Sequence, residues 1–83
     1  MKWVVVDDGV IDAWLDRESD DVIRMSLLDW LIGMSNGPGH ADGVPTLTQP
    51  GVFVARVPDT SVVVTYLVGA AFDPPFIAIR SID

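Results

Sequence analysis

The chain has 83 residues, which is enough for one domain built around a single core. Hydrophobic residues make up 49% of it and charged residues 20%, a composition typical of globular proteins and not of disordered ones. The net charge of −7 has the opposite sign to a nucleic-acid-binding surface, so we expect no generic binding of DNA or RNA. The absence of cysteine excludes a disulfide framework and a thiolate metal site.

The sequence predicts neither a signal peptide nor a membrane span. Met1-Lys2-Trp3 runs directly into a short valine-rich segment, without the apolar stretch and small-residue cleavage site of a signal peptide. The longest apolar run, residues 62–72, is far shorter than the roughly 20 residues that a membrane helix needs. We therefore expect a cytoplasmic protein without a membrane partner.

The first half of the chain predicts one strand and two helices. Residues 2–6 (Lys2 to Val6) are almost continuously apolar, which predicts a short strand buried on both faces. Asp7 or Asp8 is expected to cap a helix from about residue 9 to residue 17. The apolar stripe of that helix consists of Val10, Ile11, Trp14 and Leu15.

The second helix has the clearest signals in the chain. Ser19-Asp20-Asp21 is an N-cap pattern, and Asn36-Gly37-Pro38-Gly39 ends the helix, because glycine favours the C-cap and proline cannot continue the helix. Between these signals, one continuous helical face carries Ile23, Leu27, Trp30, Leu31 and Met34. This spacing predicts a helix that packs against the core.

The second half of the chain predicts a connector and three strands. Residues 37–51 are rich in glycine and proline, and strands are predicted at 52–57, 62–68 and 76–82. The order strand, helix, helix, strand, strand, strand predicts an α+β fold of one domain, residues 1–83. In this fold the helical hairpin packs on one face of a small, mostly antiparallel sheet, and the other face stays wholly or partly open.

The hairpin at residues 52–68 places Arg56 on the open face. A turn centred on Asp59-Thr60 pairs Phe53 with Tyr66 and Ala55 with Val64. The core face of the hairpin is then formed by Phe53, Ala55, Val57, Val62, Val64, Tyr66 and Val68. Arg56 points to the opposite face, where it is paired with Val63.

A second arginine is expected beside Arg56. If Ile79 pairs with Val64, then Arg80 lies opposite Val63, and the two arginines flank that valine about 10 Å apart at the usual strand spacing. Side chains of this length can converge on one anion, to which Thr65 can add a hydroxyl. The structural alternative is that both arginines lie flat over apolar neighbours and cover them.

The whole pattern resembles the RelE/ParE superfamily of bacterial toxin–antitoxin systems. The residues that carry the resemblance are the strand "KWVVV", a helical hairpin, the connector ending in "LTQPGVFVARV", and the strands "VVVTYLV" and "FIAIRSI". The resemblance covers nearly the whole chain. It implies a growth-inhibiting toxin, a cognate antitoxin as its partner, and no cofactor; a second copy of the chain is a further candidate partner.

The resemblance also implies roles for Arg56 and Arg80. In the RNA-cleaving branch of the superfamily, arginines at these two places contact the scissile phosphate, so a member with this activity is a ribosome-dependent endoribonuclease. Ribosome-dependent members are strongly basic, however, whereas this chain is acidic, and Tyr66 is predicted on the core face. These departures favour the ParE-like branch, which acts on DNA gyrase, and a chain that is not an enzyme.

His40 is the remaining candidate for catalysis. It is the only histidine, a residue type whose ordinary pKa lies near neutral pH, so it is the natural general-base candidate, although the sequence favours a solvated loop histidine beside Asp42. We expect no metal site.

The alternative function is that of a non-catalytic interaction protein, an orphan or phage-borne relative. It would bind a protein partner through its acidic helical surface, formed by Asp16, Glu18, Asp20 and Asp21.

Overall fold

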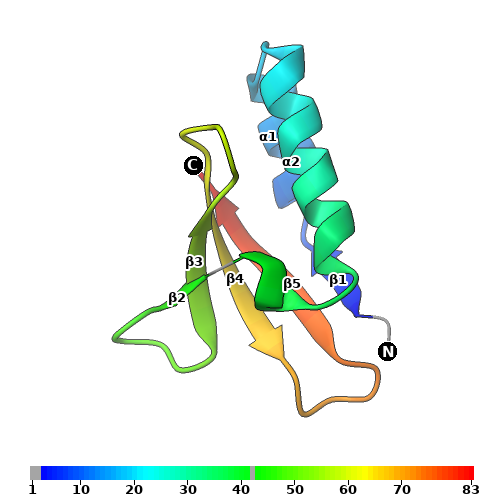
Figure 1. Cartoon of the computed structure of the whole chain (residues 1–83), viewed down its shortest axis with the longest axis vertical. Helices are drawn as coiled ribbons and strands as arrows, with labels where there is room; N and C mark the ends of the chain where they lie inside the picture. The colour runs from blue at the N-terminus through cyan, green and yellow to red at the C-terminus, as the bar shows by residue number, and fades with distance from the viewer. Residues whose placement is uncertain (1–2, 42) are drawn as a thin grey trace.

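A computed structural model (Figure 1) describes residues 3–41 and 43–83, with only the backbone described for His40. The elements in chain order are β1 (Val4–Asp7), α1 (Val10–Arg17), α2 (Asp21–Met34), the 3₁₀ helix η1 (Pro38–Ala41), β2 (Val44–Pro45), β3 (Val52–Arg56), β4 (Val63–Gly69) and β5 (Phe76–Ile82). The predicted α+β class is therefore confirmed. The 3₁₀ helix and β2, which both lie within the glycine- and proline-rich connector, were not predicted.

The strands form one mixed five-stranded sheet in the order β1-β5-β4-β3-β2. Strand β1 runs parallel to β5, and every other neighbouring pair is antiparallel. The two-residue strand β2 contains Pro45, which is tolerated because this strand lies at the edge of the sheet. In the described part of the chain, no helix combines the length and the apolar character that crossing a bilayer requires.

The hydrophobic core joins the helices to one side of the sheet. Helix α1 contributes Trp14, and α2 contributes the predicted stripe Leu27, Trp30, Leu31 and Met34, with Ile23 partly buried against them. Strands β3 to β5 and their flanking residues contribute Ala55, Val57, Val62, Val64, Tyr66, Ile77, Ile79 and Ile82. The predicted core stripes of both helices are thus confirmed.

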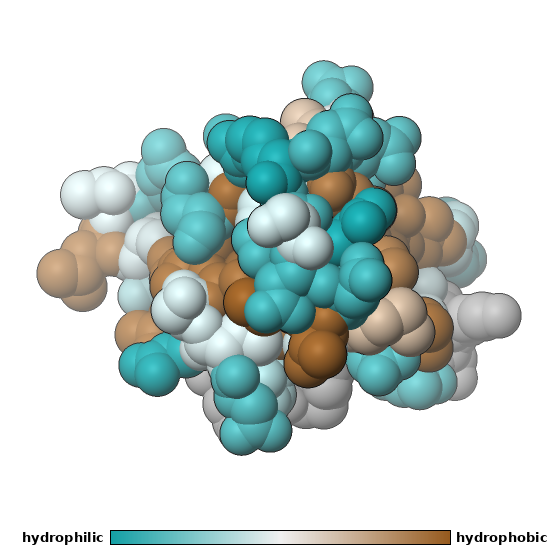
Figure 2. All heavy atoms as spheres, turned by 90° about the horizontal axis from the view of Figure 1, so that it is seen from above, coloured by the Kyte–Doolittle hydropathy of each residue, from teal (hydrophilic) through white to brown (hydrophobic). Residues whose placement is uncertain are grey.

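One end of the molecule is strongly polar. The turn between α1 and α2, the turn between β3 and β4 and the C-terminus all lie at this end (Figure 1). A view onto this end shows mostly hydrophilic residues, with hydrophobic atoms emerging between them and at the margins (Figure 2). The predicted acidic surface belongs to this end, because residues 16–21 comprise the last residues of α1, the turn at 18–20 and the first residue of α2.

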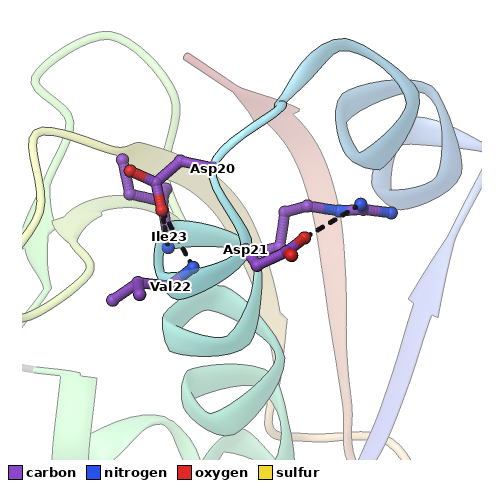
Figure 3. A network of polar contacts seen from close by, with 5 residues as sticks. Asp20, Asp21, Val22 and Ile23 are labelled. Carbon is purple, nitrogen blue, oxygen red and sulfur yellow. Dashed lines mark hydrogen bonds and ion pairs between the residues drawn. The ribbon is translucent and has the colours of Figure 1, made fainter.

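The two helices begin in different ways. Asp20 is the N-cap of α2, and its carboxylate accepts hydrogen bonds from the amides of Val22 and Ile23 at 2.9 and 3.3 Å (Figure 3), which confirms the expected cap. The predicted cap of α1 by Asp7 or Asp8 is wrong. The N-cap is Gly9, whose φ of 85° favours glycine, and Asp7 instead accepts a hydrogen bond from the amide of Gly9 at 2.7 Å.

Strand β1 is less buried than its sequence predicts. Val4 and Val6 are each 42% exposed, and only Val5 of the three valines packs against the core. The expectation of burial on both faces is wrong because β1 lies at the edge of the sheet, where neither helix covers the side carrying Val4 and Val6. Lys2, the first residue of the predicted strand, lies outside the described residues.

Candidate functional site

The hairpin between β3 and β4 fixes the position of Arg56. The observed pairs Phe53–Tyr66, Ala55–Val64 and Arg56–Val63 confirm the predicted register. The turn is held by Thr60, whose hydroxyl donates to the carbonyl of Val57 at 2.8 Å and accepts from the amide of Val62 at 3.0 Å. Arg56 is consequently an exposed side chain at the end of β3, on the face away from the core.

The register between β4 and β5 differs from the prediction. Tyr66 pairs with Ile79 and Thr65 pairs with Ser81, so Arg80 is the extra residue of a β-bulge. The expected pairing of Ile79 with Val64 is therefore wrong. After the bulge the alternation is reset, and Ile82, which a regular alternation would place on the same face as Arg80, pairs with Val64 and is buried in the core.

The bulge removes Arg80 from the row of Arg56. The residue opposite Val63 on the β5 side is Asp83, whose amide donates to the carbonyl of Val63 at 2.8 Å. Arg56 and Arg80 are separated by two strand spacings across the sheet and by two to three residues along the strand direction. Their backbones therefore lie about 12 Å apart. The two arginines can share an anion only if both side chains extend along the sheet toward each other.

Arg80 lines a hollow together with two aspartates and not with Arg56. A hollow of about 380 Å³ at the ends of β1 and β5 is lined by Val6, Asp7, Asp8, Ala78, Ile79 and Arg80. Within residues 3–41 and 43–83, neither Arg56 nor Arg80 forms an ion pair. Both guanidinium groups are therefore available to an external anion. At Arg80, however, that anion would compete with the neighbouring carboxylates of Asp7 and Asp8.

Two hydroxyl residues lie between the arginine positions. Thr65 pairs with Ser81 across β4 and β5, and both residues are half-buried. We call Arg56, Thr65, Arg80 and Ser81 the open-face polar patch. Ser81 was not predicted as part of it, because without the bulge Ser81 would have faced the core.

A third arginine also lies near the end of β5. Arg17, at the last turn of α1, donates a hydrogen bond to the carbonyl of Ile82 at 3.4 Å and lines a hollow of about 270 Å³ together with Asp83. Local sequence patterns do not predict this contact, since 65 residues separate Arg17 from Ile82. Arg17 therefore helps to hold the end of β5, and so the residues that follow the bulge.

The structure does not bring His40 to the arginines. Its backbone lies in η1, beside a hollow of about 250 Å³ lined by Pro38, Gly39, Gly43, Phe53, Tyr66 and Val68. Since Phe53, Tyr66 and Val68 belong to the core face of the sheet, η1 lies on the side away from Arg56. The side chain of His40 and the neighbouring Asp42 lie outside the described residues.

Tyr66 is placed as predicted, inside the core. Its side chain is 1% exposed, stacks on Phe53 with ring centroids 5.9 Å apart, and meets Trp30 edge-on at 6.0 Å. A group so enclosed has no access to a macromolecular substrate. Among the described residues, no group of three or more histidine, aspartate or glutamate side chains is arranged to hold a metal ion.

Comparison of the chain with protein-family models, with curated proteins and with solved structures finds no match in any of the three. The residues of the described chain offer two surfaces of different composition: the open-face polar patch, which carries Arg56 and Arg80 with Asp7, Asp8 and Asp83 nearby, and the acidic surface of the helices.

Proposed function

We propose that this chain is a small RelE/ParE-like toxin-fold protein of a bacterial toxin–antitoxin system, which inhibits growth by binding a macromolecular target. The observation that carries the proposal is the position of Arg56. It is one of five basic residues in a chain of net charge −7, yet it is exposed and without an ion pair in the described part of the chain. A cation left free in this way is suited to contact an anionic group of a partner.

Binding of a target is favoured over cleavage of RNA. Cleavage of a phosphodiester requires proton transfer in addition to charge stabilisation. Arg56 and Arg80 supply positive charge only, Tyr66 is buried, and the backbone of His40 lies on the other side of the sheet. We therefore favour a gyrase-type, ParE-like mode of action over ribosome-dependent mRNA cleavage.

The partner in the resting state would be an antitoxin segment. An extended or helical segment that crosses the open face and brings acidic residues toward Arg56 and Arg80 would neutralise both. Such a segment would cover the exposed side chains of β3 and β5. We propose a bacterial, cytoplasmic setting for this pair.

The first prediction concerns the two arginines. Replacing both (Arg56→Ala with Arg80→Ala) is expected to abolish growth arrest on induced expression, while the melting temperature stays within a few degrees, because both side chains are exposed. Arg24→Ala is the matched control, since the side chain of Arg24 forms an ion pair with the exposed Asp21 at 3.5 Å (Figure 3). Undiminished growth arrest by the double variant would remove these arginines from the mechanism, and no arrest by the wild-type chain would refute the toxin function.

A second candidate function is binding of a basic protein through the acidic helical surface. It is favoured by the exposure of Asp16 and Asp21, neither of which serves as a cap. Charge reversal at both (Asp16→Lys with Asp21→Lys) is expected to abolish binding of a basic partner in a pull-down, whereas the arginine double variant keeps it. Asp20 is left unchanged because it caps α2. The opposite pattern of losses would exclude this function.

A further inference from the structure

The solvent-facing side of α2 carries a second apolar stripe. Val22, Met25 and Ile32 are 75%, 56% and 68% exposed, and their spacing of three and seven residues places them on one helical face. This face is opposite the buried one that carries Leu27 and Met34. Exposed apolar residues that are scattered singly over a protein need no explanation, whereas several on one helical face are typical of an interaction surface.

A hollow adjoins this stripe. Between α2 and the turn that follows β3 lies a space of about 300 Å³, lined by Ser26, Asp29, Trp30, Gly33 and Pro58. Trp30 is buried and forms an apolar floor, whereas Asp29 is exposed and therefore lies at the rim. Ser26 and Gly33 are small, so the side chain of a partner can come close to the helix at this point.

The charges around the hollow select the kind of partner. Asp29 borders it directly and Asp59 follows Pro58, whereas Asp21, in the first turn of α2, does not line the hollow and is paired with Arg24 at 3.5 Å. A second copy of the chain would place these acids against its own acids, with a net charge of −7 on each copy. The complementary partner is apolar and basic.

We propose that the outward side of α2 is a docking site for an amphipathic, basic helix of another protein. The apolar face of that helix packs on Val22, Met25 and Ile32. One of its lysine or arginine side chains enters the hollow, with its aliphatic stem on Trp30 and Pro58 and its charged end on Asp29. This site lies on the helix side of the sheet and does not depend on the growth-inhibiting function of Arg56.

The apolar part of the site is tested with a fluorescein-labelled amphipathic peptide of leucine and lysine, about 18 residues long. Fluorescence anisotropy measures its affinity for the full chain. Val22→Ser with Ile32→Ser is expected to weaken binding about tenfold or more, because two apolar contacts are lost without a change of charge. The control, Val44→Ser with Leu47→Ser, removes two exposed apolar residues outside the stripe and should alter affinity less than about twofold. Equal losses in both double variants would overturn the proposal.

The acidic part is tested with the same peptide. Asp29→Asn is expected to weaken binding about fivefold, whereas Asp12→Asn, which removes the same charge from an exposed position on α1, should have little effect. If both variants lose affinity equally, the peptide responds to net charge alone and the site is refuted.

Sedimentation of the free chain should show a monomer at micromolar concentration. A dimer that Val22→Ser with Ile32→Ser dissociates would make the second copy the occupant and would overturn the proposal.

Discussion

Asp20 differs from the acids around it because its carboxylate is used inside the fold. Its oxygen accepts from two amides at the start of α2, which otherwise have no partner within the helix. The neighbouring Asp16 and Asp21 are exposed and make no such bond. A cluster of acids that looks uniform in the sequence is therefore divided into one structural residue and several residues that are available for binding.

This division predicts different costs of removal. Asp20→Ala is expected to lower the free energy of unfolding by about 1 kcal/mol, because two amides lose their acceptor. Asp16→Ala removes the same charge without a cap and should change stability by less than about 0.5 kcal/mol. Urea denaturation followed by circular dichroism measures both values. A loss of the same size in the two variants would show that charge, and not the cap, governs this turn.

At the scale of the element, the bulge in β5 decides the candidate site. A regular alternation of strand 76–82 predicts that Arg80 lies beside Val63. The buried isoleucines at 77, 79 and 82 are spaced by two and then by three residues, and this change of period is the trace that the bulge leaves in the sequence. A strand with strict period two cannot bury all three, so the spacing itself could have indicated the extra residue.

The elements that were predicted correctly have strong local signals. The stripe and cap of α2 and the register of the β3–β4 hairpin follow from spacing and turn chemistry within about 17 residues. The exposure of β1 could not be predicted, because its place at the sheet edge is set by pairing with β5, over 70 residues away. The contact of Arg17 with the end of β5 is equally non-local. Local patterns thus predicted the elements, whereas the neighbours of Arg80 could be identified only from the pairing of the strands in the sheet.

At the scale of the whole molecule, charge is distributed unevenly. Eight of the twelve acids and three of the five bases lie in the first 30 residues, which leaves −5 of the net −7 in that part of the chain. In the described residues these charges form one ion pair, Asp21 with Arg24, between largely exposed side chains, and it leaves the excess of −5 unchanged. Repulsion among the unpaired carboxylates therefore outweighs the attraction between carboxylates and basic side chains. Added salt should accordingly weaken the repulsion more than it weakens the attraction.

The last prediction follows from this imbalance. Raising sodium chloride from about 10 mM to about 500 mM shortens the screening length from roughly 30 Å to less than 10 Å. We expect the melting temperature, measured by differential scanning calorimetry, to rise by about 5 °C, which corresponds to roughly 1 kcal/mol for a domain of this size. The variant with Asp16→Lys and Asp21→Lys has a net charge of −3, since −7 plus two changes of +2 gives −3, and its response to salt should be clearly smaller. A melting temperature that falls with salt, or one that rises equally in the variant, would show that self-repulsion does not limit the stability of this fold.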